Sequence, residues 1–181
     1  MKPRIIYIHG NQAMHWSFGW APWLKQQLEK NGFSTDFQTF PDSIIARSDY
    51  WLRFLRDYVH AGENDVIVGW SSGAVAAMRY AETQKIAGSV LIGPSYTHMN
   101  DALEKQSGYF DAPWDWKAIA ANQKHMALFH SENDPFIPVS EFQEIAKQLN
   151  PKVFNFPQSG HFMEQTEFPE LLEYIVQTYG D

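Results

Sequence analysis

The chain has 181 residues, of which 44% are hydrophobic and 15% aromatic. This apolar content excludes a disordered protein, which is poor in such residues. The length is that of one domain, so we expect a single domain over residues 1–181. The formal net charge is −7, from 14 Lys and Arg against 21 Asp and Glu, without a basic cluster. We therefore expect neither a nucleic-acid partner nor binding to an anionic membrane.

Two absences narrow the class of protein further. The sequence contains no cysteine, which excludes disulfides, thiolate metal sites and a cysteine nucleophile. It also contains no run of about 18 apolar residues, and the run at residues 5–8 is too short for the apolar core of a signal peptide. We expect a soluble, cytoplasmic protein that is a monomer.

Short apolar runs alternate with segments of helical spacing along the chain. In chain order, strands are expected at residues 5–8, 33–37, 66–68, 89–92, 126–129 and 153–156, the second of them the weakest. Helices are expected around residues 23–28, 50–59, 74–81, 142–149 and 171–176. The strand runs are almost continuously apolar, which is typical of strands covered on both faces. The pattern therefore predicts a parallel α/β sheet with right-handed crossovers.

The longest stretch without a clear strand lies between residues 94 and 123. It contains five aromatic residues: Tyr96, Tyr109, Phe110, Trp114 and Trp116. In open α/β sheets the loops after the carboxyl ends of strands form the ligand crevice, so this segment is a candidate substrate wall or small cap. The alternative is a helix and loop whose aromatic side chains pack on the sheet.

The run Gly69–Gly73, with the letters GWSSG, fits the pattern G-x-S-x-G. A strand is expected before it and an Ala-rich helix after it, which is the context of a nucleophile on a tight, strained turn. The two glycines let strand and helix pass closely, while the helix N-terminus directs free N–H groups at the site. Ser71 is therefore the candidate nucleophile. The alternative is a plain strand-to-helix turn capped by Ser71 or Ser72.

A serine hydroxyl becomes a good nucleophile only when a base takes its proton. His161 is the candidate base, because it follows the last expected strand and a glycine that frees the loop. Asp134, which follows the strand at 126–129 and precedes a proline, is the candidate acid that orients the imidazole. The order serine, acid, histidine is that of α/β-hydrolases. Glu132 is the nearest rival acid; the alternative roles are a turn-former for Asp134 and an exposed loop histidine for His161.

An acyl-transfer reaction needs two N–H donors for its oxyanion. The backbone N–H of Ser72, the residue after the nucleophile, is the expected first donor. The loop after the first strand is the expected source of the second, from the backbone N–H of Asn11 or Gln12. His9, at the end of that strand, is also expected to border the site. The alternative for this loop is a simple exit from the strand.

Several stretches of the chain carry a family resemblance. They are residues 69–83, Gly10-Asn11, Phe18–Trp20, Gly108–Phe110, Pro113–Trp116, Asp134–Phe136 and Gly160–Phe162. Together they resemble the retinoblastoma-binding protein 9 family of small serine hydrolases, over essentially the whole chain and with the spacing kept. The resemblance implies a compact three-layer α/β-hydrolase with a mostly parallel sheet of about six strands and little or no lid. It also implies a triad on Ser71, Asp134 and His161.

Two positions depart from the family pattern. The residue before the nucleophile, often histidine in such turns, is Trp70, so the family's substrate preference does not carry over. We expect Trp70, together with His9, Tyr109, Phe110 and Trp114, to line the substrate pocket. In vertebrate relatives an L-x-C-x-E motif binds the retinoblastoma pocket, and the matching stretch here, residues 59–63, lacks its Leu and Cys. A retinoblastoma-type partner is therefore not expected.

The leading hypothesis is a serine hydrolase that cleaves a small ester or activated amide through an acyl-enzyme on Ser71. Carboxylesterase and aminoacyl amidase activities both remain open. The alternative is a protein-interaction module on a hydrolase scaffold with little turnover, because fold does not fix function. Metal-dependent hydrolysis is disfavoured, since no His-x-His or His-Glu-x-x-His spacing occurs. The first strand is not followed by G-x-G-x-x-G, and neither a metal nor an organic cofactor is expected.

Overall fold

The structure of the protein is a computed structural model that describes residues 2–12 and 14–180. The strands are β1 (Arg4–Ile8), β2 (Thr35–Phe37), β3 (Asp65–Trp70), β4 (Gly88–Ile92), β5 (His125–Ser131) and β6 (Lys152–Phe156). The helices are α1 (Ala21–Lys30), α2 (Ser48–Arg53) with a π-helical turn (Phe54–Tyr58) directly after it, α3 (Ser72–Ala81), α4 (Ala102–Ser107), α5 (Trp116–Ala121), α6 (Val139–Leu149) and α7 (Pro169–Tyr179). All of the expected strands and helices are present. Within the described residues, no helix has the length and apolar character needed to cross a membrane.

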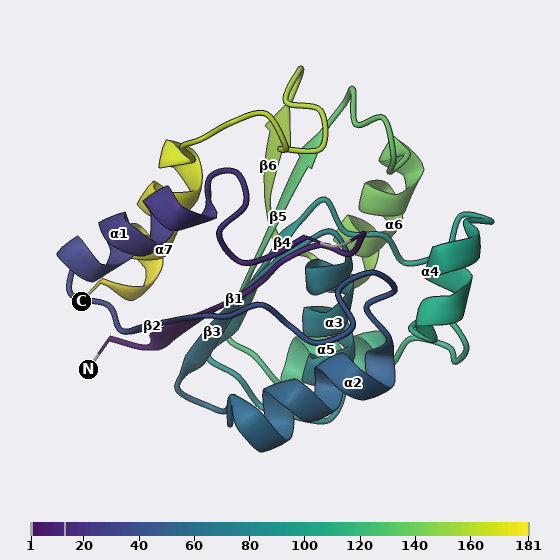
Figure 1. Ribbon diagram of the computed structural model, residues 1–181, viewed down its shortest axis with the longest axis horizontal. Helices are drawn as coiled ribbons and strands as arrows, with labels where there is room; N and C mark the ends of the chain where they lie inside the picture. Colours follow the sequence, from purple (N-terminus) through teal and green to yellow (C-terminus); the bar gives the residue numbers. More distant parts are fainter. Residues whose placement is uncertain (1, 13, 181) are drawn as a thin grey trace.

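The six strands form one parallel sheet in the order β2-β1-β3-β4-β5-β6. Helices α1 and α7 cover one face, and α2, α3, α5 and α6 cover the other, which gives the three layers seen in Figure 1. The predicted three-layer α/β fold with a parallel sheet is therefore confirmed. The chain leaves β1 toward one edge for β2, then returns to the other side of β1 for β3. Such a reversal of strand order opens a crevice at the carboxyl ends of the two strands on either side of it, β1 and β3.

Alternating side chains of β1, β3, β4 and β5 supply two separate hydrophobic cores, one on each face of the sheet. In β1, Ile6 and Ile8 pack on the side of α3, whereas Ile5 and Tyr7 face α1 and α7. None of these four residues is more than 1% exposed. Burying an aliphatic side chain of this size contributes roughly 1.5–3 kcal/mol. Burial on both faces of the sheet is the physical reason for the continuous apolar runs in the sequence.

Helix α3 is enclosed along its whole length, because each of its residues is buried. Two glycines let it lie against the sheet. A Cβ at Gly73 would collide with the backbone carbonyls of Ile8 and His9, at the end of β1. A Cβ at Gly69 would collide with the backbone of Gly73 and Ala74. Strand β3 and helix α3 therefore meet in a turn that only glycine allows at these two positions.

The aromatic segment between residues 94 and 123 is held by one buried cation. Arg79 of α3 donates hydrogen bonds to the carbonyls of Tyr109, Ala112 and Pro113, at 2.7, 2.6 and 3.2 Å. Its guanidinium also lies 3.6 Å from the centre of the Trp114 ring. The segment contains α4 and α5, and its aromatic side chains pack on the core of this face. These aromatic side chains therefore pack on the sheet, as the alternative interpretation of the segment predicts.

We predict that Gly73→Ala destabilises the protein by about 2 kcal/mol, because the new methyl group meets backbone carbonyls that cannot rotate away. The higher helix propensity of alanine, about 1 kcal/mol, opposes this clash without offsetting it. Urea unfolding measures the difference. Gly62→Ala is the matched control, because no atom lies within 4 Å of its added Cβ. Equal stabilities of the two variants would contradict the close approach of α3 to β1.

Candidate active site

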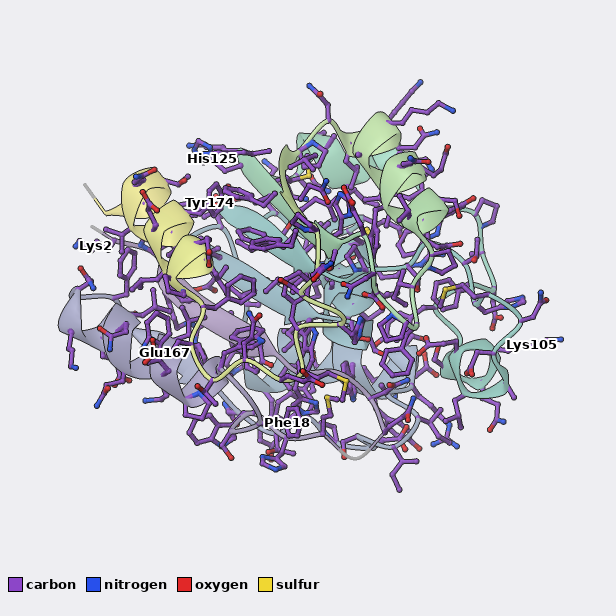
Figure 2. All side chains as sticks on the ribbon, turned by 90° about the horizontal axis from the view of Figure 1, so that it is seen from above. Lys2, Phe18, Lys105, His125, Glu167 and Tyr174 are labelled. Atoms are coloured by element: carbon purple, nitrogen blue, oxygen red, sulfur yellow. The ribbon has the colours of Figure 1, made fainter. Side chains whose placement is uncertain are left out.

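Three residues expected at the site follow the carboxyl ends of parallel strands. Ser71 follows β3, Asp134 follows β5 and His161 follows β6. They therefore lie at one edge of the sheet, which the loop after β1 also reaches. In Figure 2, His125 at the start of β5 marks the opposite, amino edge, and Lys105 on α4 lies across the molecule from it. Helix α4 thus belongs to the edge that carries the candidate site.

Ser71 sits on the turn between β3 and α3 in a strained backbone conformation. Its φ and ψ are 55° and −122°, a region that residues with a side chain rarely adopt. The Ser71 N–H donates to the carbonyl of Ile92 at 2.8 Å, and its carbonyl accepts from the N–H of Ala74 at 2.9 Å. The Ser71 side chain makes no capping hydrogen bond to the helix. The alternative of a plain turn capped by Ser71 therefore does not explain this conformation.

Asp134 and His161 form a direct pair. Nδ1 of His161 lies 2.7 Å from Oδ2 of Asp134, and the two side chains are only 5% and 0% exposed, His161 first. The second carboxylate oxygen, Oδ1, accepts from the backbone N–H groups of Phe136 and Ile137 at 2.9 and 3.0 Å. The carboxylate is thus fixed through both oxygens. Because Nδ1 of the imidazole is committed to it, Nε2 is the ring nitrogen that is free to exchange a proton.

The rival acid, Glu132, is engaged elsewhere. Its Oε1 accepts from Nδ2 of Asn155 on β6 at 2.7 Å. The loops after β5 and β6, which carry Asp134 and His161, are also joined by a hydrogen bond. Oδ1 of Asn133 accepts from the N–H of Gly160 at 2.8 Å. The side of the pocket that contains Asp134 and His161 is therefore held together by hydrogen bonds between the two loops.

Ser71 and His161 line the same pocket, which has a volume of about 450 Å³. Gly93, with a φ of 56°, leaves room for the imidazole, since an added Cβ there would come within 3.0 Å of its Cε1. No hydrogen bond joins the Ser71 hydroxyl to the imidazole in the part of the chain that the structure describes. In free enzymes this contact is often long and tightens only in the complex with substrate. A serine on a strained turn and a histidine paired with a buried carboxylate therefore meet in one pocket.

The residues expected to supply the oxyanion donors differ in what their amides already bind. Ser72 begins α3, so its N–H is one of the free donors of a helix N-terminus. Gln12, in contrast, donates its backbone N–H to the carbonyl of Ile44 at 3.0 Å. Because the amide of Gln12 is engaged, Asn11 is the better candidate of the two residues expected on the first loop.

His9 supports this first loop and does not border the pocket. Its Nε2 accepts from the N–H of Phe40 at 2.8 Å, so Nδ1 carries the proton and donates to the carbonyl of Gly10 at 2.6 Å. Burial lowers the pKa of His9, which keeps the ring neutral in this role. The ring is fully buried and packs edge-on to Phe40 and Trp51. The expectation that His9 lines the substrate pocket is therefore corrected.

The other four side chains expected to line the pocket also lie outside it. They are Trp70, Tyr109, Phe110 and Trp114. Trp70 is completely buried in the core under α1 and α7, and its Nε1 donates to the carbonyl of His161 at 3.0 Å. The other three pack on the opposite core, around α3. The expectation is corrected for all four, because composition does not distinguish an aromatic core from an aromatic pocket.

The pocket is instead lined by loops after the strand ends and by α4. Its apolar groups come from Met14, Met99, Phe136, Ile137 and Met163. Three of the six methionines of the chain are among them. Their flexible thioether side chains adapt to apolar groups of different shape. The sequence feature that could have identified these pocket residues is their position in loops that directly follow strands.

Glu104 on α4 is a candidate functional residue that the sequence did not reveal. Its Oε1 accepts from Nδ2 of Asn11 at 2.7 Å and from the Ser72 hydroxyl at 3.4 Å. Its Oε2 is buried without a hydrogen-bond partner among the described residues. Burial raises the pKa of this carboxyl, although the hydrogen bond from Asn11 opposes the rise. Nothing in residues 2–12 and 14–180 gathers three or more His, Asp or Glu side chains into a possible metal site. A perturbed carboxylate in a pocket is typical of a functional site.

We predict that Glu104→Gln raises the stability of the protein at neutral pH. The folded-state pKa of Glu104 lies above the ordinary value of 4.5, so the folded state disfavours the ionised form. This cost is absent below the ordinary pKa and grows as the pH rises to the folded-state pKa, above which it is constant. The amide keeps an acceptor for Asn11 and does not ionise, so the variant gains stability relative to the wild type as the pH rises from about 4 to about 7. Urea unfolding of both proteins at about pH 4 and pH 7 measures it. An equal difference at both pH values would show that burial of the charge is not the cause.

Comparisons with known proteins identify the family of the chain. A family described as Serine hydrolase matches residues 5–177. Serine hydrolase RBBP9 of Rattus norvegicus is 41% identical over 167 residues, which are 92% of this chain and 88% of that protein. YdeN of Bacillus subtilis (strain 168) is 27% identical over 175 residues, which are 94% of this chain and 92% of that protein.

Solved structures share the fold. The crystal structure of the ydeN gene product from B. subtilis has a TM-score of 0.90 at 24% identity, covering 99% of this chain and 100% of that chain. Est1E from Butyrivibrio proteoclasticus, solved with ferulic acid bound, has a TM-score of 0.72 at 15% identity, covering 97% of this chain and 87% of that chain. These likenesses confirm the α/β-hydrolase fold. On the match over residues 5–177 and the identity with RBBP9, the chain belongs to the serine hydrolase family.

Proposed function

We propose that the protein hydrolyses a small ester or amide through an acyl-enzyme on Ser71. The observation that carries the proposal is the strained turn that presents Ser71 at the N-terminus of α3, in one pocket with the His161–Asp134 pair. Strained backbone persists only where the surrounding structure enforces it, and it is concentrated at catalytic sites. A buried carboxylate bonded to one imidazole nitrogen suits a base that gains and loses a proton at the other.

In the proposed reaction, the Ser71 hydroxyl attacks the carbonyl carbon and Nε2 of His161 takes its proton. The developing oxyanion accepts hydrogen bonds from the backbone N–H groups of Ser72 and Asn11, each worth about 3 kcal/mol of the barrier. Asp134 orients the imidazole and stabilises its charged form. His161 then protonates the leaving alcohol or amine as the C–O or C–N bond breaks. Water, activated by the same histidine, releases the acyl group and restores Ser71.

The pocket favours small acyl groups. Its volume of about 450 Å³ is toward the lower end of the range for small-molecule sites, about 300–1,000 Å³. One wall is formed by Glu104 of α4. Methionine and other apolar side chains line the pocket together with the polar residues Gln12, Asn100 and Asp101. A short or compact acyl chain fits this space.

The Glu104 carboxylate bears on the choice between a plain ester and an aminoacyl substrate. Its Oε2 has no partner among the described residues, and the side chain borders the pocket next to Asn11. A protonated amine beside the scissile carbonyl would give this oxygen a charged donor, and charge-assisted hydrogen bonds are the strong ones. We therefore propose that an acyl group with an α-ammonium group is preferred over its neutral counterpart.

The acyl-enzyme is tested with a fluorophosphonate probe and mass spectrometry of the modified residue. We expect rapid labelling at Ser71, lost in Ser71→Ala and in His161→Ala. Asp134→Asn is expected to lower kcat by about 10⁴-fold, because the imidazole loses its orienting charge. Ser140→Ala, at an exposed position on α6, is the matched control and keeps full labelling. A folded protein that is not labelled would refute the proposal and favour an interaction module without turnover.

The preference for an ammonium group is tested with alanyl and propionyl esters that have the same leaving group. We expect Glu104→Gln to lower the alanyl-to-propionyl ratio of kcat/KM by about 10-fold or more, since a hydrogen bond to a charged group is lost. The intrinsic reactivity of the two esters cancels in this comparison. Glu170→Gln, at an exposed position on α7, is the control. An unchanged ratio in Glu104→Gln would leave the plain esterase as the proposed function.

A further inference from the structure

A second hollow adjoins the Ser71 pocket. It has a volume of about 660 Å³ and shares Pro135, Phe136, His161 and Met163 with that pocket. The rest of its lining comes from the loops after β5 and β6, and we call it the loop groove. Ser71 lines only the first pocket, whereas His161 lines both. The imidazole therefore stands between the two spaces.

The chemistry of acyl transfer assigns different parts of a substrate to the two spaces. The carbonyl carbon must reach Ser71, and its oxygen must reach the backbone N–H groups of Ser72 and Asn11. Ser71 and Asn11 line the first pocket and not the loop groove, and Ser72 directly follows Ser71. The acyl group therefore occupies that pocket. The leaving atom must lie within reach of His161, because the imidazole returns the proton to it. The group attached to the leaving atom thus extends past His161 toward the loop groove.

The loop groove offers polar groups that the fold itself does not use. The side chains of Gln158, Ser159, Glu164 and Gln165 line it and make no hydrogen bond to another described residue. Asn133, in contrast, uses its Oδ1 to hold the neighbouring loop at 2.8 Å. The backbone of the groove is therefore fixed, while four polar side chains remain free to bind.

Phe136 and Glu164 limit what the groove accepts. Phe136 is 56% exposed although it is aromatic, and its ring lies edge-on to His161 with 5.3 Å between ring centres. It offers an apolar surface on the carbon skeleton of a group that passes the imidazole. Glu164 adds a negative charge to the groove, which disfavours an anionic group.

We propose that the loop groove is the leaving-group subsite, and that it selects an alcohol or amine with several hydrogen-bonding groups and without negative charge. The inference rests on the proposed acyl-enzyme at Ser71. It goes beyond it by assigning selectivity to the group that departs rather than to the acyl group. Each hydrogen bond gained from the groove is expected to change kcat/KM by about 2- to 10-fold.

The test uses two steps. A series of p-nitrophenyl esters first identifies an acyl group that the protein hydrolyses. With that acyl group, kcat/KM is then compared for the 1-glyceryl ester and the n-propyl ester, whose leaving groups differ by two hydroxyls. We expect the wild-type ratio to exceed the ratio of alkaline hydrolysis by about 10-fold, and the double variant Gln158→Ala/Gln165→Ala to bring it within about 2-fold of that reference. Gln177→Ala, at an exposed position on α7, is the matched control and keeps the wild-type ratio.

The outcomes separate the subsite from the reaction itself. If no p-nitrophenyl ester is hydrolysed, the subsite is overturned, and absence of labelling at Ser71 would show that the proposed acyl-enzyme fails with it. If Ser71 is labelled and p-nitrophenyl esters are hydrolysed, but the wild-type glyceryl-to-propyl ratio equals the chemical one, the subsite is overturned and the acyl-enzyme stands. The subsite is likewise overturned if neither alkyl ester is hydrolysed, or if the double variant keeps the wild-type ratio.

Discussion

The site depends on the close approach of α3 to β1. With Gly73 against the carbonyl of Ile8, the helix starts so near the sheet that the turn has no room for an ordinary conformation. Ser71 therefore adopts a φ of 55°, at a cost of about 1–3 kcal/mol. Burial of every residue of α3 offsets this cost. The same approach brings the N-terminus of the helix beside the loop of Asn11, so that two strand ends face one pocket.

Elements and strand ends could be predicted well from the sequence, but side-chain directions could not. Ser71, Asp134 and His161 were found because each follows an apolar run, and the carboxyl ends of parallel strands must share an edge. The expected place of Trp70 is wrong because the direction of its side chain depends on the face of β3 from which it projects. A strand that is buried on both faces has no alternation of polar and apolar residues, so its sequence does not show which side chains project from which face. The segment between residues 94 and 123 does form a wall of the pocket, through Met99 and Glu104, but Tyr109, Phe110 and Trp114 turn away from it. Their direction depends on Arg79, which lies on a separate element.

Glu104 illustrates a different limit of the sequence. It is the third residue of a six-residue helix, where a glutamate is ordinary, and nothing in its neighbours marks it. Its environment comes from Asn11 and Ser72, which are distant in the chain. Oε2 of Glu104 is buried without a hydrogen-bond partner among the described residues, which is unfavourable for the free energy of folding. Unfavourable features of this kind are concentrated at functional sites. The fold tolerates it because Oε1 is hydrogen-bonded to both of these residues.

The position of His161 on the last loop before α7 determines when the site is completed during synthesis of the chain. Synthesis runs from the N-terminus, so β1, β3 and α3 are complete while the chain after residue 150 is still to emerge. A nascent chain therefore contains Ser71 before it contains His161. On the proposed assignment, the unfinished chain is inert toward esters around it until the edge strand β6 and the loop behind it have docked.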